Sequence, residues 1–277
     1  MTVVIFGGKG FIGSKLALKF PGAALPSVDI ADSAAVRQIL DSEKPSVVIN
    51  AAGKTGKPNV DWCEDHKVET LRSNVTGPLV LLEECLKRGI YFAHIGSGCI
   101  YDGDGGKPDG FTEEDRPNFT GSFYSLTKAM SDQLLAPFPV LQVRLRMPFD
   151  DAPGPRNLIT KLLGFKKVLD VRNSITYIPD FLDAFEVLVK KRATGTYNIV
   201  NSGAVSPYEI MQRYQKLVDP KHVFERLTLA DLPTVVKAAR SNCTLGNQKL
   251  KKEGITVLPV EAAVDRALMA LVKSDRR

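Results

Sequence analysis

The chain has 277 residues, which is long enough for a sizeable core in one large domain, or in a large domain and a smaller one. Its hydrophobic content of 44% and charged content of 25% are typical of globular proteins, and no apolar run approaches the roughly 20 residues that a membrane helix needs. The net charge is +6, from 37 basic and 31 acidic residues, and the basic residues are interspersed. We therefore expect anionic small ligands such as nucleotides, and neither nucleic acid nor a membrane as partner.

The N-terminus and the cysteines indicate a cytoplasmic protein without a metal site. Met1 leads directly into TVVIFGG, which is typical of a strand and not of an export signal. The four cysteines show neither a CxxC pair nor metal-ligand spacing, so we expect reduced thiols in the cytoplasm. The three histidines are scattered, which argues against a zinc site.

The first motif is a glycine-rich turn between a predicted strand and a predicted helix. TVVIF is apolar and β-branched, GGKGFIG follows, and SKLALKF has helical spacing. In G-x-x-G-x-x-G, Gly7 permits a tight turn, Gly10 lets the backbone approach a pyrophosphate, and Gly13 lets helix and strand pack closely. The helix N-terminus would present its N–H groups to the phosphates. The flanking elements favour dinucleotide binding over a purely structural turn.

The segment after this helix departs from the usual dinucleotide-binding pattern, in which a second strand ends in an acid that holds the adenosine ribose. No clear second strand precedes Asp29. Asp29 and Asp32 are candidates for contacting the adenine, although Asp32 is better explained as the N-cap of the helix AAVRQIL. No obvious acid is available for the ribose, and Lys9 and Lys15 lie near the turn. We therefore expect NADP(H) to be preferred, with NAD(H) as the alternative.

Two residues further along are open to either a structural or a functional interpretation. SVVINAAG is typical of another buried strand, ending in small residues where a cofactor could lie against the backbone. Asn74 lies inside a helical pattern that follows, and it either bonds to a neighbouring strand or faces water. Trp62, the only tryptophan, falls in a predicted loop and either packs there or lines the substrate pocket.

The stretch from Gly96 to Lys128 carries the predicted catalytic groups. A predicted strand, YFAHIGSGCIY, carries Ser97 and Cys99 at its carboxyl end, and because alternate side chains of a strand share a face, we expect these two to point the same way. SFYSLTK places Tyr124 and Lys128 four residues apart, on one face of a helix. A cation beside a phenol favours the phenolate, so the tyrosine can exchange a proton near neutral pH. Y-x-x-x-K is common on helices and is weak evidence by itself. Together with the neighbouring motifs, it indicates acid–base groups for ketone reduction.

Alternating strand and helix patterns predict an α/β fold with a Rossmann-type, doubly wound parallel sheet and a smaller C-terminal substrate-binding lobe. We expect residues 1–150 to form the NADP-binding domain, because the alternation continues to VLQVRLRMPF. The pattern loosens after about Asp150. We expect residues 151–277 to be mainly the substrate-binding lobe, with some elements returning to the sheet.

Taken together, GGKGFIG, NAAG, Ser97, Tyr124 and Lys128 resemble the extended short-chain dehydrogenase/reductase superfamily. Longer strings are similar to the nucleotide-rhamnose synthase/epimerase-reductase family, the bifunctional 3,5-epimerase/4-reductases of the plant UDP-rhamnose route; these are KTGKPNVDWCEDHKVETLRSNVTG, GSGCIY, EEDRPNFTGSFYSLTKAM, RLRMPF and GPRNLITK. The resemblance covers essentially the whole chain. It departs where Ser97 replaces the usual threonine and where DGDGGKPDG replaces a long insert.

The resemblance implies an enzyme that converts UDP- or dTDP-4-keto-6-deoxy-D-glucose to the β-L-rhamnose nucleotide with NADPH. Ser97, Tyr124 and Lys128 would serve the reduction, Cys99 would be the epimerase base, and Lys161 would be its acid partner. A structural, buried thiol is the alternative for Cys99, and an exposed helix lysine is the alternative for Lys161. A thiol acts as a base only with a lowered pKa, which a nearby lysine would favour.

The remaining predicted site residues fall into two groups, and the arginines among them have surface salt bridges as the alternative interpretation. The predicted cofactor-binding residues are Gly7, Lys9, Gly10, Phe11, Ile12, Gly13, Asp29, Ile30, Ala51, Ala52, Gly53, Asn74, Tyr124, Lys128 and Met147. The predicted substrate-binding residues are Asn59, Asp61, Trp62, Ser97, Arg156, Asn157 and Arg240.

Two rival functions share many of these predicted residues or the predicted fold. A monofunctional 4-dehydrorhamnose reductase has the Ser/Tyr/Lys set but does not need Cys99. A non-catalytic nucleotide-binding subunit on the same fold is the second rival, since fold does not determine function. Such subunits commonly lose the tyrosine or the lysine, and both are present here. The sequence leaves open the choice of UDP or dTDP and whether the chain forms a homodimer.

Overall fold

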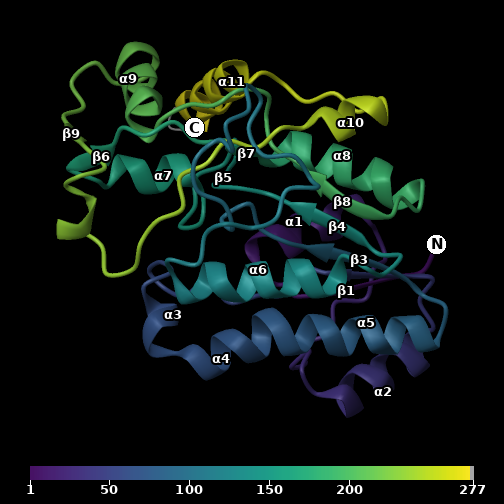
Figure 1. Ribbon diagram of the computed structural model, residues 1–277. Helices are drawn as coiled ribbons and strands as arrows, with labels where there is room; N and C mark the ends of the chain where they lie inside the picture. Colours follow the sequence, from purple (N-terminus) through teal and green to yellow (C-terminus); the bar gives the residue numbers. More distant parts are fainter. Residues whose placement is uncertain (275–277) are drawn as a thin grey trace. The chain divides into compact units, whose positions relative to one another are not determined.

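A computed structural model describes residues 1–274, and the chain divides into two compact units (Figure 1). The first unit comprises Met1–Ile100, Pro117–Arg144 and Phe185–Tyr197, and the second comprises Tyr101–Arg116, Leu145–Ala184 and the chain from Asn198 onward. The predicted boundary at residue 150 and the predicted roles of the two domains stay predictions. The last three residues of the predicted lobe, 275–277, lie outside the described residues.

The first unit is built on a largely parallel sheet. Its strands, in spatial order, are β1 (Val3–Phe6), β2 (Val47–Asn50), β3 (Tyr91–Ile95), β4 (Leu141–Arg144) and β8 (Gly195–Asn198). The pairings from β1 through β4 are all parallel, and every residue of these four strands is buried. Burial on both faces explains why the strands read as nearly continuous apolar runs. The predicted α/β, Rossmann-type fold class is confirmed.

Helices cover this sheet as the sequence pattern predicts. The longer ones are α1 (Phe11–Lys19), α2 (Ser33–Glu43), α5 (Gly77–Lys87) and α6 (Phe123–Leu135). One core cluster joins the strands to α2, α5 and α6, through Phe6, Val48, Phe92, Leu40, Leu81 and Leu135 among others. Two short helices, α3 (Trp62–Asp65) and α4 (Lys67–Leu71), and a π-helical turn at Arg72–Thr76 lead into α5. The short α3 lies within the segment that the sequence predicts as a loop.

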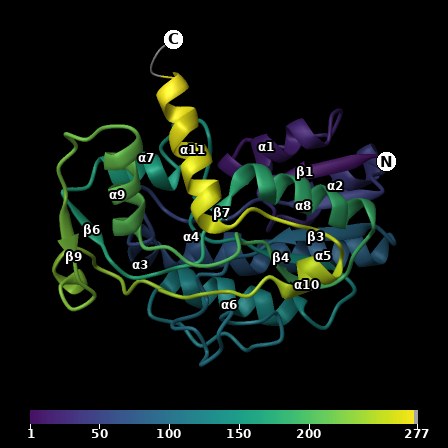
Figure 2. The same cartoon turned by 90° about the horizontal axis from the view of Figure 1, so that it is seen from above.

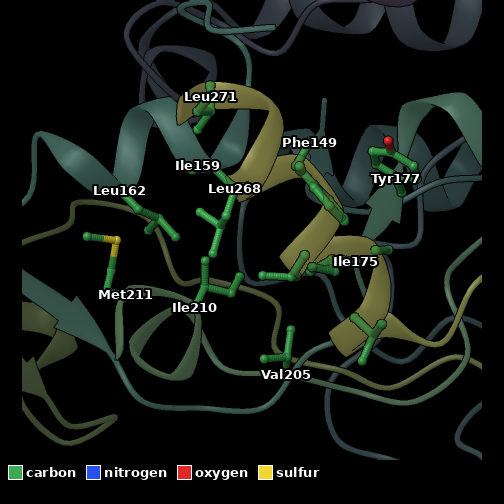
Figure 3. Close-up of a cluster of buried hydrophobic side chains, with 14 of the residues drawn as sticks. Phe149, Ile159, Leu162, Ile175, Tyr177, Val205, Ile210, Met211, Leu268 and Leu271 are labelled. Atoms are coloured by element: carbon green, nitrogen blue, oxygen red, sulfur yellow. The ribbon is translucent and has the colours of Figure 1, made fainter. Parts of the chain in front are cut away.

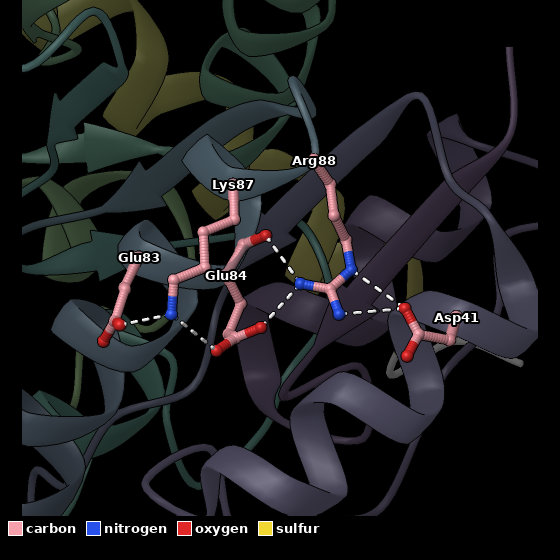
Figure 4. Close-up of polar contacts among 5 residues, drawn as sticks. All are labelled: Asp41, Glu83, Glu84, Lys87 and Arg88. Carbon is pink, nitrogen blue, oxygen red and sulfur yellow. Dashed lines mark hydrogen bonds and ion pairs between the residues drawn. The ribbon is translucent and has the colours of Figure 1, made fainter.

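A charged cluster ties α2 to α5 (Figure 4). Arg88 follows α5, and its guanidinium lies 2.9 Å from the Asp41 carboxylate on α2 and 2.5 Å from the Glu84 carboxylate on α5. Glu84 is almost fully buried, and its partner Arg88 compensates the cost of burying that charge. The cluster therefore has a structural explanation and needs no ligand.

The second unit contains little regular sheet. Strand β5 (Pro148–Phe149) pairs with β7 (Thr176–Tyr177), and β6 (Lys167–Leu169) pairs with β9 (Glu225–Leu227), both in parallel. Its helices are α7 (Leu158–Leu163), the start of α8 (Ile178–Lys190), α9 (Pro207–Leu217), α10 (Gln248–Lys252) and α11 (Val260–Ser274), with a 3-10 turn at Leu232–Thr234. Figure 3 shows the core between α7, α9 and α11, and Figure 2 shows these helices from above. Ser206 and Glu209 form a capping box that begins α9.

Candidate active site

The glycine turn has the close packing that its spacing predicts. Gly7 has a φ of 76°, and a Cβ there would lie 2.4 Å from the backbone nitrogen of Ala52. A Cβ at Gly13 would lie 2.1 Å from the carbonyl oxygen of Gly7, so any side chain there would overlap the turn. Helix α1 begins after Gly10 without a side-chain cap. Its first N–H groups are therefore available for an anionic ligand.

The second strand of the usual dinucleotide-binding unit is reduced to a single bridge, between Val4 and Ala24. Asp29 lies five residues beyond this bridge and receives hydrogen bonds from the backbone of Ala31 at 2.9 Å and from Nε of Arg72 at 2.7 Å. These bonds hold the pKa of the Asp29 carboxyl below its usual range, the Ala31 bond contributing most. The sequence did not point to Arg72 as the partner of Asp29.

The neighbours of Asp29 have structural roles. Asp32 accepts hydrogen bonds from the backbone of Ala34 and Ala35, which confirms its interpretation as the N-cap of α2. Ile30 is buried, and its side chain lies so close to Gly77 that a Cβ there would clash with it. Asp29 is exposed and lies at the edge where the adenosine of a dinucleotide is predicted.

Asn74 bonds across the unit instead of facing water. Its Oδ1 accepts from the backbone N–H of Lys54 at 2.8 Å, and its Nδ2 donates to the carbonyl of Lys54 at 3.0 Å and to Oγ1 of Thr127 at 3.2 Å. It lies in the π-helical turn, a type of distortion that is frequent at functional sites. Asn74 therefore fixes the loop after β2, which contains Ala51–Gly53, relative to helix α6.

Ser97 and Cys99 lie beyond the end of a strand. Strand β3 ends at Ile95, and residues 98–100 form a turn, so the expectation that a strand continues through Cys99 is wrong. Alternation of side chains along a strand consequently does not apply to this pair. Oγ of Ser97 instead accepts a hydrogen bond from the backbone N–H of Cys99 at 3.1 Å. Ser97 is buried, whereas Cys99 is partly exposed and is a free thiol.

Helix α6 places Tyr124 and Lys128 beside this turn. Lys128 is only 6% exposed, and its Nζ donates to the carbonyl of Ile95 at 3.2 Å. Burial lowers the pKa of Lys128 to about 8, while the charges of Asp132 and Cys99 act in the opposite direction. The sulfur of Cys99 therefore lies within electrostatic reach of the ammonium. Tyr124 is partly exposed, one helical turn before Lys128.

A buried polar pair lies beneath Lys128. Asn50 and His94 are paired in the register of β2 and β3, and Nδ2 of Asn50 lies 3.1 Å from Nδ1 of His94. Burial, and secondarily Lys128, hold the pKa of His94 well below its usual range, so the imidazole is neutral. Neither residue is among the site residues predicted from the sequence. Its signal is a polar residue near the carboxyl end of each of two neighbouring apolar strands.

The loop between β2 and α3 is held by aromatic and polar contacts. The Trp62 and His66 rings stack with centroids 3.8 Å apart, and Nζ of Lys54 lies 5.7 Å from the Trp62 ring. Oδ1 of Asn59 accepts from the backbone N–H of Asp61 at 2.8 Å. Trp62 therefore has packing partners, and the role of these residues in binding substrate stays a prediction.

The predicted site residues of the second unit have local partners of their own. Asn157 is fully buried and caps α7, since its Oδ1 accepts from Ile159 N–H and its Nδ2 donates to the carbonyls of Asp150 and Ala152. The pKa of Lys161 is lowered, first by burial and then by Arg156. Nη1 of Arg240 donates to the carbonyl of Ala238 at 2.7 Å, and Met147 has a left-handed φ of 42°. Among these residues, Asn157 is the one with a complete structural explanation.

A cavity of about 380 Å³ in the second unit contains none of the predicted site residues. Its lining comes mostly from α9 and α11 and includes two ion pairs, with Arg213 2.8 Å from Asp265 and Arg172 3.6 Å from Glu209. Within residues 1–274 there is no cluster of three acidic, histidine or cysteine side chains that could hold a metal ion. No helix in the described part of the chain has the length and apolar character needed to cross a membrane.

Comparison with known sequences supports the resemblance. The sequence pattern of the family described as RmlD substrate binding domain matches residues 1–272. A bifunctional dTDP-4-dehydrorhamnose 3,5-epimerase/dTDP-4-dehydrorhamnose reductase from Arabidopsis thaliana is 42% identical over 260 residues, which cover 90% of this chain and 86% of that one. Other matched relatives are longer, and the chain spans only 36% to 41% of their length.

Solved structures show the same fold. The UDP-rhamnose synthase from Acanthamoeba polyphaga mimivirus is 31% identical and superposes with a TM-score of 0.92, over 98% of this chain and 99% of that one. A dTDP-4-dehydrorhamnose reductase from Bacillus anthracis, solved in complex with NADP, has a TM-score of 0.82 at 19% identity, over 97% of this chain and 98% of that one. The family resemblance that the sequence motifs indicate is confirmed.

Proposed function

Because this chain belongs to the RmlD substrate binding domain family, we propose that it is a bifunctional 3,5-epimerase/4-reductase of nucleotide-sugar metabolism. Its substrate in this proposal is UDP- or dTDP-4-keto-6-deoxy-D-glucose, its product is the β-L-rhamnose nucleotide, and its reductant is NADPH. The observation that carries the proposal is the turn after β3, where the backbone N–H of Cys99 bonds to Oγ of Ser97 and Nζ of the buried Lys128 bonds to the carbonyl of Ile95. A reductase alone would not need the Cys99 thiol.

The glycine turn fits a dinucleotide phosphate. The clashes that a Cβ would make at Gly7 and Gly13 show that the backbone is packed for close approach, and the N-terminus of α1 has no side-chain cap. Lys9 and Lys15 add positive charge nearby, and Arg72 partly neutralises Asp29. This charge balance favours NADP(H), with NAD(H) as the weaker alternative. When bound, the cofactor supplies the hydride that reduces the keto carbon.

The thiol is proposed to serve the epimerisation. Carbons 3 and 5 of the sugar flank the 4-keto group, so their protons are acidified by the carbonyl. The Cys99 thiolate takes the proton, the electrons of the broken C–H bond form an enolate, and Ser97 and Tyr124 stabilise the charge on its oxygen. A proton then returns to the opposite face of the carbon. We assign that donor to Lys161, whose pKa is lowered by burial and by the neighbouring Arg156.

The phenol is proposed to serve the reduction. As hydride adds to the keto carbon, Tyr124 gives its proton to the developing alkoxide, and Ser97 orients the oxygen. Lys128 holds a positive charge beside this group and thereby strengthens the phenol as an acid. Asn74 and the Asn50–His94 pair keep the surrounding loop and strands in place. The same hydroxyls therefore serve both half-reactions.

A turnover assay tests the proposal. Purified protein would be given each 4-keto-6-deoxy nucleotide with NADPH or NADH, and the products would be resolved by NMR. We expect the β-L-rhamnose nucleotide, faster with NADPH, and a loss of roughly a thousandfold in reduction for Tyr124→Phe, which removes only the hydroxyl. Reduction confined to a pre-epimerised substrate would favour the monofunctional reductase. No NADPH consumption at all would favour the nucleotide-binding subunit.

A further inference from the structure

Glu64 makes a contact that the proposed chemistry does not use. It lies on the short helix α3, and its Oε1 accepts a hydrogen bond from the backbone N–H of Phe123 at 2.7 Å. Phe123 is the first residue of α6, and Tyr124 is the next. A side chain 59 positions earlier in the chain thus holds the turn that carries the phenol.

This contact adds a second side-chain acceptor at the N-terminus of α6. The first N–H groups of a helix have no partner within it. Oγ of Ser122 accepts from Ser125 N–H at 3.1 Å, and the Glu64 carboxylate accepts from Phe123 N–H. A carboxylate at this end also interacts favourably with the helix dipole. Ser122 alone would be an ordinary cap, so the distant carboxylate adds a connection to another part of the unit.

That other part is the segment predicted to contact the sugar nucleotide. Glu64 shares the single turn of α3 with Trp62, whose ring stacks on His66. Gly56, in the preceding loop, packs so tightly that a Cβ there would lie 2.6 Å from Cβ of Trp62. The loop, α3 and the start of α6 are therefore held together by direct contacts. A displacement of Trp62 would therefore be passed to Tyr124 through the Glu64 side chain.

We propose that Glu64 is a positioning residue, which ties the Trp62 segment to the start of α6 and so fixes Tyr124 for proton donation. This inference rests on the proposed reduction, because it assigns Tyr124 a proton to give. It adds a link from the substrate loop to the phenol that the Ser/Tyr/Lys set does not contain. A misplacement of the phenol by about 1 Å is enough to cost as much as a hundredfold in rate.

Three variants separate this role from general stabilisation. Glu64→Ala removes the acceptor, Glu64→Gln keeps an oxygen that can accept the same N–H, and Glu69→Ala removes an exposed carboxylate on α4 as the matched control. We expect Glu64→Ala to lower kcat for ketone reduction by about ten- to a hundredfold while the Kd for NADPH is unchanged. Glu64→Gln should recover most of the rate. Glu69→Ala should match the parent protein.

Amide hydrogen exchange at Phe123 and Tyr124 gives a second readout, which does not depend on turnover. We expect exchange there to accelerate at least about tenfold in Glu64→Ala only, with the rest of α6 unchanged. An unchanged kcat in Glu64→Ala would overturn the inference and leave the proposed function standing. If the parent protein turned over no keto sugar, the proposed function would fail and the catalytic part of the inference with it, while exchange would still show whether Glu64 holds this turn.

Discussion

The two units use buried polar side chains in different ways. In the first, a parallel sheet satisfies most of the buried backbone, and Asn50, Asn74 and Lys128 gather near the carboxyl edge of β2 and β3. In the second, where sheet is scarce, the buried polar side chains that bond the backbone lie at scattered positions instead of along one sheet edge. Arg146, 1% exposed, donates to the carbonyl and hydroxyl of Ser241, and Oδ1 of Asn173 accepts from Cys243 N–H.

This difference shows where sequence patterns are informative. A parallel sheet collects polar groups at one edge, so a polar residue following an apolar strand indicates a site. An irregular unit scatters buried amides wherever the backbone needs them, and these have no regular spacing. A conspicuous arginine or asparagine in the second unit is consequently weaker evidence for binding than one at the sheet edge.

The largest expected effect tests the packing at the glycine turn. Gly13→Ala places a methyl group against the Gly7 carbonyl, a backbone atom that cannot move aside. We expect a loss of about 3 kcal/mol in the free energy of unfolding and a loss of NADP⁺ binding. Gly154→Ala is the control, because nothing lies within 4 Å of the Cβ that it would add and the residue is outside the glycine turn. Thermal unfolding and calorimetric titration measure both; equal behaviour of the two variants would contradict the packing.

An intermediate effect tests the buried ammonium by pH. The folded-state pKa of Lys128 is about 8, below the ordinary 10.5, so between these values the unfolded chain binds more protons. The free energy of unfolding should therefore rise with pH across this interval, by up to ~3 kcal/mol relative to Lys128→Met. The rate of ketone reduction should fall over the same range, because the neutral Lys128 amine no longer makes the Tyr124 phenol a stronger acid. A rate that stays level from pH 7 to about 9.5 would refute this assignment.

The smallest expected effect concerns the second unit. Asn157→Ala removes the cap of α7 and leaves two carbonyls without their donor. We expect the free energy of unfolding to fall by about 1–2 kcal/mol. Arg156→Ala, at the neighbouring, partly exposed position, should leave stability nearly unchanged and raise KM for the nucleotide sugar. If Asn157→Ala instead altered KM without altering stability, the structural role of this amide would be wrong.

The sequence was sufficient for the fold class, the glycine turn and the Tyr124–Lys128 helix, since these depend on local periodicity and spacing. It could not give the end of β3 at Ile95, because GSGCIY is compatible with a continuing strand. Contacts between segments that are distant in the sequence could not be predicted either. The bonds from Glu64 to Phe123 and from Arg72 to Asp29 each join residues more than 40 positions apart and leave no periodic signal.

The assignment of two reactions to one site is tested most directly by solvent deuterium. The 4-keto-6-deoxy nucleotide would be incubated in D₂O with NADPH, and incorporation at carbons 3 and 5 would be followed by NMR for the parent protein and for Cys99→Ala. We expect deuterium at both carbons with the parent protein, a loss of at least about a hundredfold in Cys99→Ala, and continued reduction of a pre-epimerised substrate by that variant. Incorporation that persists undiminished without the thiol would contradict the account.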